Sequence, residues 1–257
     1  MSGSLLEVRD LRLGVAGRTL FDQLSFSVHP GEVWCLLGPN GSGKTTFLLS
    51  AMGLRDVQGG TVGLQGKALA AWDPLEAARV RGFLPQIIHD AFGASVIECV
   101  MMGRHPHLGR WEWEGGPERD IALSMLAQVD LTGFENRDVL TLSGGERQRV
   151  ALAALFAQDT SLLLLDEPVS HLDLHHQIMV LSYLAMLARE KERGVLFSIH
   201  DLNLAARFAS HAVILAPGGR VSLGAIDRVM TEDILSNAFG HRVTRVEHAG
   251  RPLFIPE

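Results

Sequence analysis

The fold of this chain is decided by the stretch Val33-Trp34-Cys35-Leu36-Leu37-Gly38-Pro39-Asn40-Gly41-Ser42-Gly43-Lys44-Thr45-Thr46. Its apolar first part predicts a buried strand, and residues 38–45 match the pattern G-x-x-x-x-G-K-T. Apolar residues at helical spacing follow from Phe47 to Met52. A glycine-rich loop between a strand and a helix is the context in which this pattern binds phosphate. The stretch therefore predicts an α/β phosphate-loop core.

The chemistry of this loop follows from its backbone. Glycines let successive N–H groups turn inward around phosphate oxygens, and the start of the helix adds the positive end of its dipole. In this pattern Lys44 contacts the β- and γ-phosphates, and the Thr45 hydroxyl binds Mg²⁺. The predicted nucleotide-binding residues of the loop are Gly38, Pro39, Asn40, Gly41, Ser42, Gly43, Lys44, Thr45 and Thr46.

A second strand ends in two carboxylates. The apolar run 162–165 leads into Asp166 and Glu167, and Pro168 stops the strand. Downstream of a phosphate loop, an aspartate in this position holds Mg²⁺, which leaves Glu167 to polarise the attacking water. We therefore predict that Asp166 is a metal ligand and that Glu167 is the general base.

The segment Leu142-Ser143-Gly144-Gly145-Glu146 predicts the start of a further helix. Ser143 and Glu146 are spaced as a capping box, which is a purely structural role. The same helix start also offers a hydroxyl and glycine amides, so it suits a second anion site. Two anion-binding helix starts for one triphosphate are explained if each nucleotide lies between two copies of the chain.

Hydrophobic patterning places these motifs in one layout, a single domain over residues 1–257. We expect a parallel sheet, a small antiparallel β layer at the start, and an inserted helical subdomain at about 87–153. The long helix 177–189 should lie between two strands of the core. The expected strands are 5–13, 24–28, 33–37, 59–64, 162–165, 195–199 and 212–215, and the first two are separated by a turn at Gly17 and Arg18.

Composition excludes several classes of protein. The 257 residues carry a net charge of −6 with no run of Lys or Arg, so we expect no nucleic-acid partner. We also expect no signal peptide and no membrane span, because no apolar stretch approaches about 20 residues. Cys35 and Cys99 both lie in apolar stretches and are expected to be reduced, buried thiols.

With these residues in view, the chain resembles the ATP-binding cassette (ABC) ATPases. Residues 142–146 are similar to the signature motif of that family, and they follow the phosphate loop in the family's order. Gln86 resembles the Q-loop residue, and residues 170–173 (Ser-His-Leu-Asp) resemble the D-loop. His200 resembles the switch histidine. The match runs over nearly the whole chain, and five motifs in one order are highly specific.

The resemblance implies particular roles and cofactors. It implies that the nucleotide is ATP and that Gln86 contacts both Mg²⁺ and the lytic water. It also implies that His200 binds the γ-phosphate and that Asp173 links the two copies. The full set of expected catalytic residues is Glu167, His200 and Gln86. The expected metal ligands are Thr45, Gln86 and Asp166, and the partner copy's nucleotide should meet Ser143, Gly144, Gly145, Glu146 and Asp173.

One position departs from the family pattern. ABC subunits usually stack adenine on an aromatic residue before the phosphate loop, and Val15 stands there in this chain. Base–aromatic stacking contributes roughly 1–3 kcal/mol per base. We therefore expect loose binding and weak preference among purine triphosphates.

Two further stretches resemble the importer ATPases for metal chelates, namely iron-siderophores, haem and cobalamin. They are residues 100–110 and the tail from His200 to Leu253. The resemblance implies a peripheral subunit on the cytoplasmic face of the inner membrane. Its partners would be polytopic permease subunits, a second copy of itself and, indirectly, a substrate-binding protein. The cargo and the roles of Trp111 and Trp113 stay open.

Other functions leave parts of the sequence unexplained. A soluble ABC ATPase of translation or DNA repair would usually carry two cassettes, a long coiled coil or basic arms, and none is visible. An ABC subunit for another cargo stays open. A phosphate-loop kinase would give no role to Ser143 or His200. The histidines His105, His107, His171, His175 and His176 include His-x-His and His-His spacings that can bind zinc, but a zinc site usually needs four ligands, often with cysteine or carboxylate support, so we expect no metal site there.

Overall fold

The core of the molecule is a six-stranded sheet in the order β10-β9-β3-β8-β7-β6. The computed structural model describes residues 3–15, 17–88, 93–109 and 116–257. The strands are β3 (Val33–Leu37), β6 (Arg81–Leu84), β7 (Leu162–Leu165), β8 (Gly194–Ser198), β9 (His211–Leu215) and β10 (Val221–Ala225). All neighbours pair in parallel except β9 and β10. The predicted parallel sheet is confirmed, with one antiparallel edge strand.

A second, four-stranded antiparallel sheet lies beside the first, in the order β2-β1-β4-β5. It consists of β1 (Leu6–Val15), β2 (Arg18–Val28), β4 (Gly59–Leu64) and β5 (Lys67–Ala68). Its apolar residues share one core with helix α1 (Lys44–Ala51) and with one face of the central sheet. The predicted β layer is confirmed. Arg18 was expected in the turn, but it pairs with Val15 as the first residue of β2.

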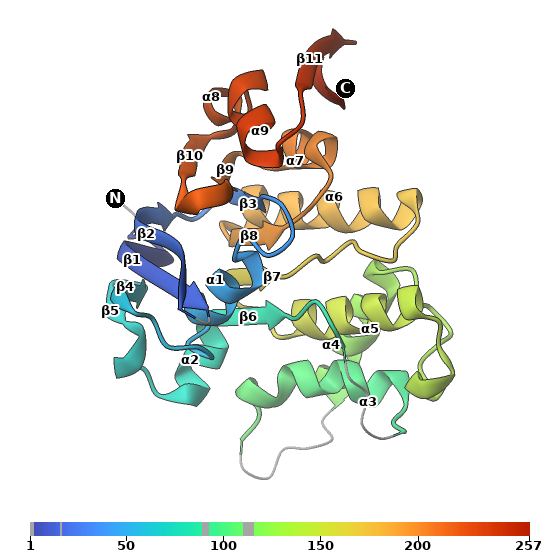
Figure 1. The fold of residues 1–257 in the computed structure, drawn as a ribbon. Coiled ribbons are helices and arrows are strands. Elements are labelled where there is room, and N and C mark those ends of the chain that lie inside the picture. Colours follow the sequence, from blue (N-terminus) through green and yellow to red (C-terminus); the bar gives the residue numbers. More distant parts are fainter. Residues whose placement is uncertain (1–2, 16, 89–92, 110–115) are drawn as a thin grey trace.

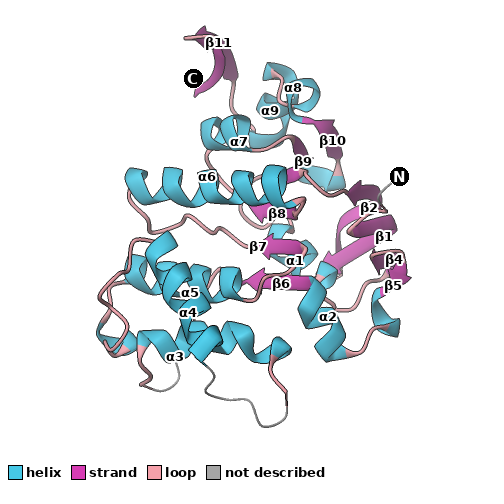
Figure 2. Ribbon diagram, turned by 180° about the vertical axis from the view of Figure 1, so that it is seen from behind, coloured by secondary structure: helices cyan, strands magenta, loops and turns pink. Residues whose placement is uncertain are grey.

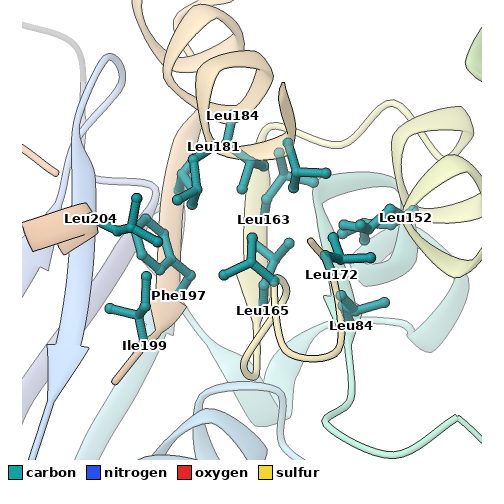
Figure 3. Close-up of a cluster of buried hydrophobic side chains, with 14 of the residues drawn as sticks. Leu84, Leu152, Leu163, Leu165, Leu172, Leu181, Leu184, Phe197, Ile199 and Leu204 are labelled. Atoms are coloured by element: carbon teal, nitrogen blue, oxygen red, sulfur yellow. The ribbon is translucent and has the colours of Figure 1, made fainter. Parts of the chain in front are cut away.

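Helices cover the other face of the central sheet (Figures 1 and 2). Leu181 and Leu184 of α6 (Leu174–Lys191) pack on Leu163 and Phe197 of the sheet (Figure 3). Helices α3 (Val96–Met101), α4 (Gly116–Gln128) and α5 (Gly144–Ala157) lie together at one end of the molecule. The range 87–153 expected for a helical insertion thus contains α3, α4 and most of α5.

Several elements have no counterpart in the sequence prediction. They are the strands β5, β6 and β10, together with α2 (Pro74–Val80), α7 (Leu202–Phe208), α8 (Ile226–Val229), α9 (Glu232–Phe239), β11 (Val243–His248) and β12 (Arg251–Pro256). Four short 3-10 helices complete the described part: η1 (Leu69–Ala71), η2 (Met102–His107), η3 (Val139–Thr141) and η4 (Pro217–Gly219). The side chain of Asn203 binds the backbone of Phe254 through two hydrogen bonds, and so fastens β12 to α7.

The composition led to expectations about the two cysteines and about membrane-spanning helices. Cys35 and Cys99 form no disulfide within the described residues; Cys35 is fully buried, as predicted, whereas Cys99 is only half-buried. Within the described ranges, no helix has the length and apolarity needed to cross a bilayer.

Candidate nucleotide-binding and catalytic site

The phosphate loop lies between β3 and α1, at the carboxyl end of the central parallel strands. Gly38 has φ 150° and Gly43, the N-cap of α1, has φ 106°. A Cβ atom at Gly38 would lie 2.6 Å from the carbonyl oxygen of Leu215. The loop can pass this close to β9 only with glycine at position 38, which is the physical reason for that residue type in the pattern.

Lys44 is the first residue of α1 and is 6% exposed. Its ammonium group donates to the carbonyl oxygens of Gly38 and Pro39, at 2.8 and 3.3 Å. Burial lowers the pKa of Lys44, and the negative charges of Glu167 and Asp166 act in the opposite direction. The lysine therefore holds the loop in shape, and its charge faces the two carboxylates that end β7.

A cleft of about 600 Å³ opens beside this loop. Six of the predicted loop residues line this cleft: Asn40, Gly41, Gly43, Lys44, Thr45 and Thr46. The three predicted catalytic residues Gln86, Glu167 and His200 line the same cleft. They follow three neighbouring strands, β6, β7 and β8, whose carboxyl ends meet at one edge of the sheet. The cleft residues of the loop and these three groups range from position 40 to position 200 of the sequence, and the sheet brings them together.

Asp166 has the features of a metal ligand. It is 1% exposed, and its Oδ1 accepts a hydrogen bond of 2.6 Å from the Ser198 hydroxyl. Its Oδ2 is buried and has no hydrogen-bond partner among the described residues. A buried carboxylate oxygen without a partner is costly unless a cation completes it. Thr45 and Gln86 offer further oxygen atoms in the adjacent cleft, so the residues present fit Mg²⁺.

Glu167 and His200 contact each other directly. Glu167 Oε1 lies 2.6 Å from His200 Nε2, and the side chains are 15% and 46% exposed. Glu167 has φ 50°, a left-handed conformation that is uncommon for a non-glycine residue. Its carbonyl oxygen accepts hydrogen bonds from the N–H and the hydroxyl of Ser170. The predicted general base is therefore held on both sides, by His200 and by its own backbone contacts.

The helix start at Ser143 is built differently and does not line the described walls of the cleft. Ser143 is the N-cap of α5 and forms a complete capping box with Glu146. Ser143 Oγ lies 2.7 Å from Glu146 Oε2, and this hydrogen bond holds the pKa of Glu146 below its usual value. Ser143 and Gly144 are exposed. Within one chain, the structure does not bring this predicted anion site to the phosphate loop.

Asp173 also lies away from the cleft lining. It is the N-cap of α6, where its Oδ1 accepts hydrogen bonds from the backbone N–H of His176 at 2.9 Å and from its ring Nδ1 at 2.8 Å. The backbone hydrogen bond and the nearby His176 ring hold the pKa of Asp173 below its usual value. The side chain is 67% exposed, so its free face points to solvent in the single chain.

The far end of the cleft is formed by residues of the first hairpin. Val15 lines the cleft and is 38% exposed, and Arg18 and Leu20 lie beside it. Val15 and Arg18 are directly paired across β1 and β2, so their side chains share one face of the hairpin. Sequence reasoning considered only Val15 here. The pairing of Arg18 depends on the strand register, which the motif pattern does not contain.

The remaining candidate residues carry no site in the described part of the chain. Trp111 and Trp113 lie outside the described residues. His107 Nε2 lies 2.8 Å from the carbonyl oxygen of Gln158, a structural contact. Over the ranges that the structure describes, no group of three or more His, Cys, Asp or Glu side chains is arranged to hold a metal ion.

Comparisons with known proteins agree with this geometry. The family model described as "ABC transporter" matches residues 21–170. The chain is 41% identical to a hemin import ATP-binding protein, HmuV, of Myxococcus xanthus, over 98% of this chain and 97% of that protein.

Two solved structures extend the comparison to three dimensions. One is described as an inward-facing conformation of a metal-chelate type ABC transporter; it has a TM-score of 0.85 and 28% identity, covering 99% of this chain and 98% of that chain. The other is the dimeric structure of a bacterial ABC transporter cassette, with a TM-score of 0.75 and 25% identity over 86% of this chain and 98% of that chain.

Proposed function

The chain belongs to the ABC transporter family, and from this premise we propose that it is the ATP-hydrolysing subunit of an importer of haem or a related metal chelate. The observation that carries the proposal is the single cleft lined by Lys44, Glu167, Gln86 and His200. ATP hydrolysis is the activity of this family of ATP-binding domains. The assignment of individual residues and of the cargo is the proposal.

In this proposal the triphosphate lies on the loop at residues 38–45, and the base lies toward Val15 and Arg18. The loop amides and Lys44 hold the β- and γ-phosphates. Thr45, Gln86 and Asp166 would hold Mg²⁺, which would neutralise charge on the phosphates. The unpartnered Oδ2 of Asp166 supports this arrangement because it is an acceptor that the described protein leaves free.

Hydrolysis then requires an activated water at the γ-phosphate. We assign Glu167 to polarise this water, which attacks the γ-phosphorus while the bond to the β–γ bridging oxygen breaks. ADP and phosphate are the products. His200 lies 2.6 Å from Glu167, so it can orient the carboxylate and contact the γ-phosphate. Both groups sit at ends of rigid strands, which suits a reaction that depends on positioning.

The second anion site implies a pair of chains. Ser143 and Gly144 are exposed at the start of α5, and they do not line the cleft within one chain. We propose that each cleft is completed by residues 143–146 of a second copy in a head-to-tail dimer, with Asp173 linking the two copies. The dimeric form of the related bacterial cassette supports this arrangement.

The membrane partners and the cargo are inferred from the relatives. The HmuV relative is a hemin import ATP-binding protein, and the similar solved structure is of the metal-chelate type. We propose that the dimer binds two permease subunits on the cytoplasmic side of the inner membrane. A separate substrate-binding protein would deliver the chelate to the permease.

Co-purification followed by a transport assay tests this function. The chain should be recovered from detergent-solubilised membranes with a polytopic protein. The complex in proteoliposomes, with its binding protein, should then take up haem in an ATP-dependent manner. Uptake of an iron-siderophore or cobalamin instead would change the cargo and keep the importer. Recovery of ribosomes or DNA, with no membrane protein, would contradict the proposal.

A further inference from the structure

One buried hydroxyl contacts both residues that follow β7, Asp166 and Glu167. Ser198 is the last residue of β8 and is 0% exposed. Its Oγ donates to Asp166 Oδ1 at 2.6 Å and accepts the backbone N–H of Glu167 at 2.8 Å. A serine hydroxyl has one proton to donate, so this proton is committed to Asp166. A single side chain on the neighbouring strand therefore holds two consecutive residues of the site.

The first consequence concerns the orientation of Asp166. The backbone N–H of Asp166 donates to the carbonyl oxygen of Leu84 at 2.8 Å, which fixes its main chain to β6. The hydroxyl of Ser198 then fixes the carboxylate by occupying Oδ1. Oδ2 is left as the buried oxygen without a partner in the described structure. The acceptor that suits Mg²⁺ is thus selected by a hydrogen bond to the other oxygen.

The second consequence concerns the backbone of Glu167. Its φ of 50° is unfavourable for an L-residue and needs support from its surroundings. Ser198 binds the N–H of this residue, and Ser170 binds its carbonyl oxygen. These contacts direct the side chain toward His200, where Oε1 is found 2.6 Å from Nε2. Loss of the Ser198 hydroxyl would release the Glu167 peptide and the Asp166 carboxylate together.

We propose that Ser198 is a positioning residue that holds Asp166 ready for Mg²⁺ and the Glu167 backbone ready for catalysis. The proposal rests on the proposed function, because it takes Asp166 as a metal ligand and Glu167 as the base. Ser198 does not line the cleft and acts only through these two residues. Removal of an outer hydrogen-bond partner of a metal ligand typically costs 10–100-fold in metal affinity or activity.

The test measures how much Mg²⁺ strengthens nucleotide binding, without turnover. The affinity of the full chain for a non-hydrolysable ATP analogue is measured by isothermal titration, once in Mg²⁺ and once in EDTA. Ser198→Ala should leave the affinity in EDTA within about twofold and reduce the Mg²⁺-dependent gain by about 10–100-fold. An unchanged gain would overturn the proposal, and so would an equal loss in both buffers.

A matched control separates this effect from general damage to the core. Ser50 is also a buried serine, 2% exposed, and its hydroxyl has no hydrogen-bond partner in the described structure. Ser50→Ala should keep the full Mg²⁺-dependent gain. If the unchanged protein itself showed no gain with Mg²⁺, the metal site of the proposed function would fail, which is a different result from failure of Ser198 alone.

A pair of variants of equal shape isolates the hydroxyl. Ser198→Thr retains it and Ser198→Val lacks it, so the first should keep the Mg²⁺-dependent gain and the second should lose it. If neither folds, Ser198→Cys offers a weak donor of similar size and should give an intermediate gain. In ATP hydrolysis, Ser198→Val should lower kcat by about 10–100-fold at saturating Mg-ATP, and KM for Mg-ATP should rise because the Mg²⁺-dependent gain in binding is lost. A change in KM alone would contradict the positioning role.

Discussion

The two helix starts of this molecule that suit an anion are built in opposite ways. At the phosphate loop, glycines with positive φ shape the turn of the backbone, and a buried lysine faces two carboxylates. At Ser143, the side chains of Ser143 and Glu146 satisfy each other in a capping box on an exposed helix end. The first region lines the cleft of its own chain, whereas the second does not. In the proposed dimer, this difference defines which part of each site the second chain supplies.

The largest effect should come from Glu167, the carboxylate that lines the same cleft as the phosphate loop. Glu167→Gln removes the general base and should lower kcat for ATP hydrolysis by about 10²–10⁴-fold. Because the phosphate loop is untouched, ATP should still bind and should hold the dimer closed. Steady-state kinetics and light scattering with ATP measure the two effects. Unchanged turnover would remove Glu167 from its assigned role.

The base end of the cleft should respond to a new aromatic ring. Val15→Tyr would add a stacking surface worth about 1–3 kcal/mol, which corresponds to about 5–150-fold tighter ATP binding. The affinity for tripolyphosphate, which has no base, should stay unchanged and serves as the control. If Val15→Tyr did not strengthen ATP binding, the contact with the base would be assigned to Arg18, which lies on the same face of the hairpin.

Mixing two inactive chains tests whether the helix starts meet across a dimer. Lys44→Ala inactivates the phosphate loop, and Ser143→Arg inactivates the helix start that should meet the partner's nucleotide. In a head-to-tail dimer of one chain of each kind, one cleft contains both defects and the other contains none. Random mixing should therefore restore roughly a quarter of the unmodified ATPase rate. No restoration in a mixture shown to form mixed dimers would mean that Ser143 does not complete the partner's cleft.

The capping box at Ser143 has a counterpart that carries no proposed function. Ser95 and Glu98 form the same arrangement at the start of α3. Ser95→Ala and Ser143→Ala should each lower the free energy of unfolding by about 1 kcal/mol, measured in urea. Only Ser143→Ala should also lower ATP hydrolysis. Equal loss of hydrolysis in both variants would reduce Ser143 to a helix cap.

The smallest effect is the pH dependence of this cap. The hydrogen bonds from Ser143 lower the pKa of Glu146, so its ionised form stabilises the folded state. This contribution is fully present above the ordinary pKa of a glutamate, about 4.3, and is lost as the pH falls through the lowered value. Glu146→Gln should remove that part of the pH dependence in unfolding experiments between about pH 3 and 6. If Glu146→Gln and the unmodified protein showed the same dependence of unfolding free energy on pH, Glu146 would not contribute through its lowered pKa.

Contiguous motifs were predicted well because their chemistry is local. The loop at residues 38–45 needs its glycines, lysine and threonine at fixed spacing, and the run 162–165 needs only apolar residues before two carboxylates. Both were placed correctly in the sheet. The elements after β9 were missed, since α8, α9 and the two strands of the β11–β12 hairpin are short, at four to eight residues each. Asn203 ties that hairpin to α7 by contacts 51 positions apart.

The sequence by itself determined the phosphate-loop core, the paired carboxylates and the second helix start, because each depends on residues that are neighbours in the chain. Only the tertiary structure decided which groups share a cleft. The order of β3, β8, β7 and β6 sets the neighbours at one edge of the sheet, and no local pattern encodes that order. Ser198 reaches Asp166 and Glu167 across 32 and 31 positions because hydrogen-bond contacts between strands depend on register and not on separation along the chain.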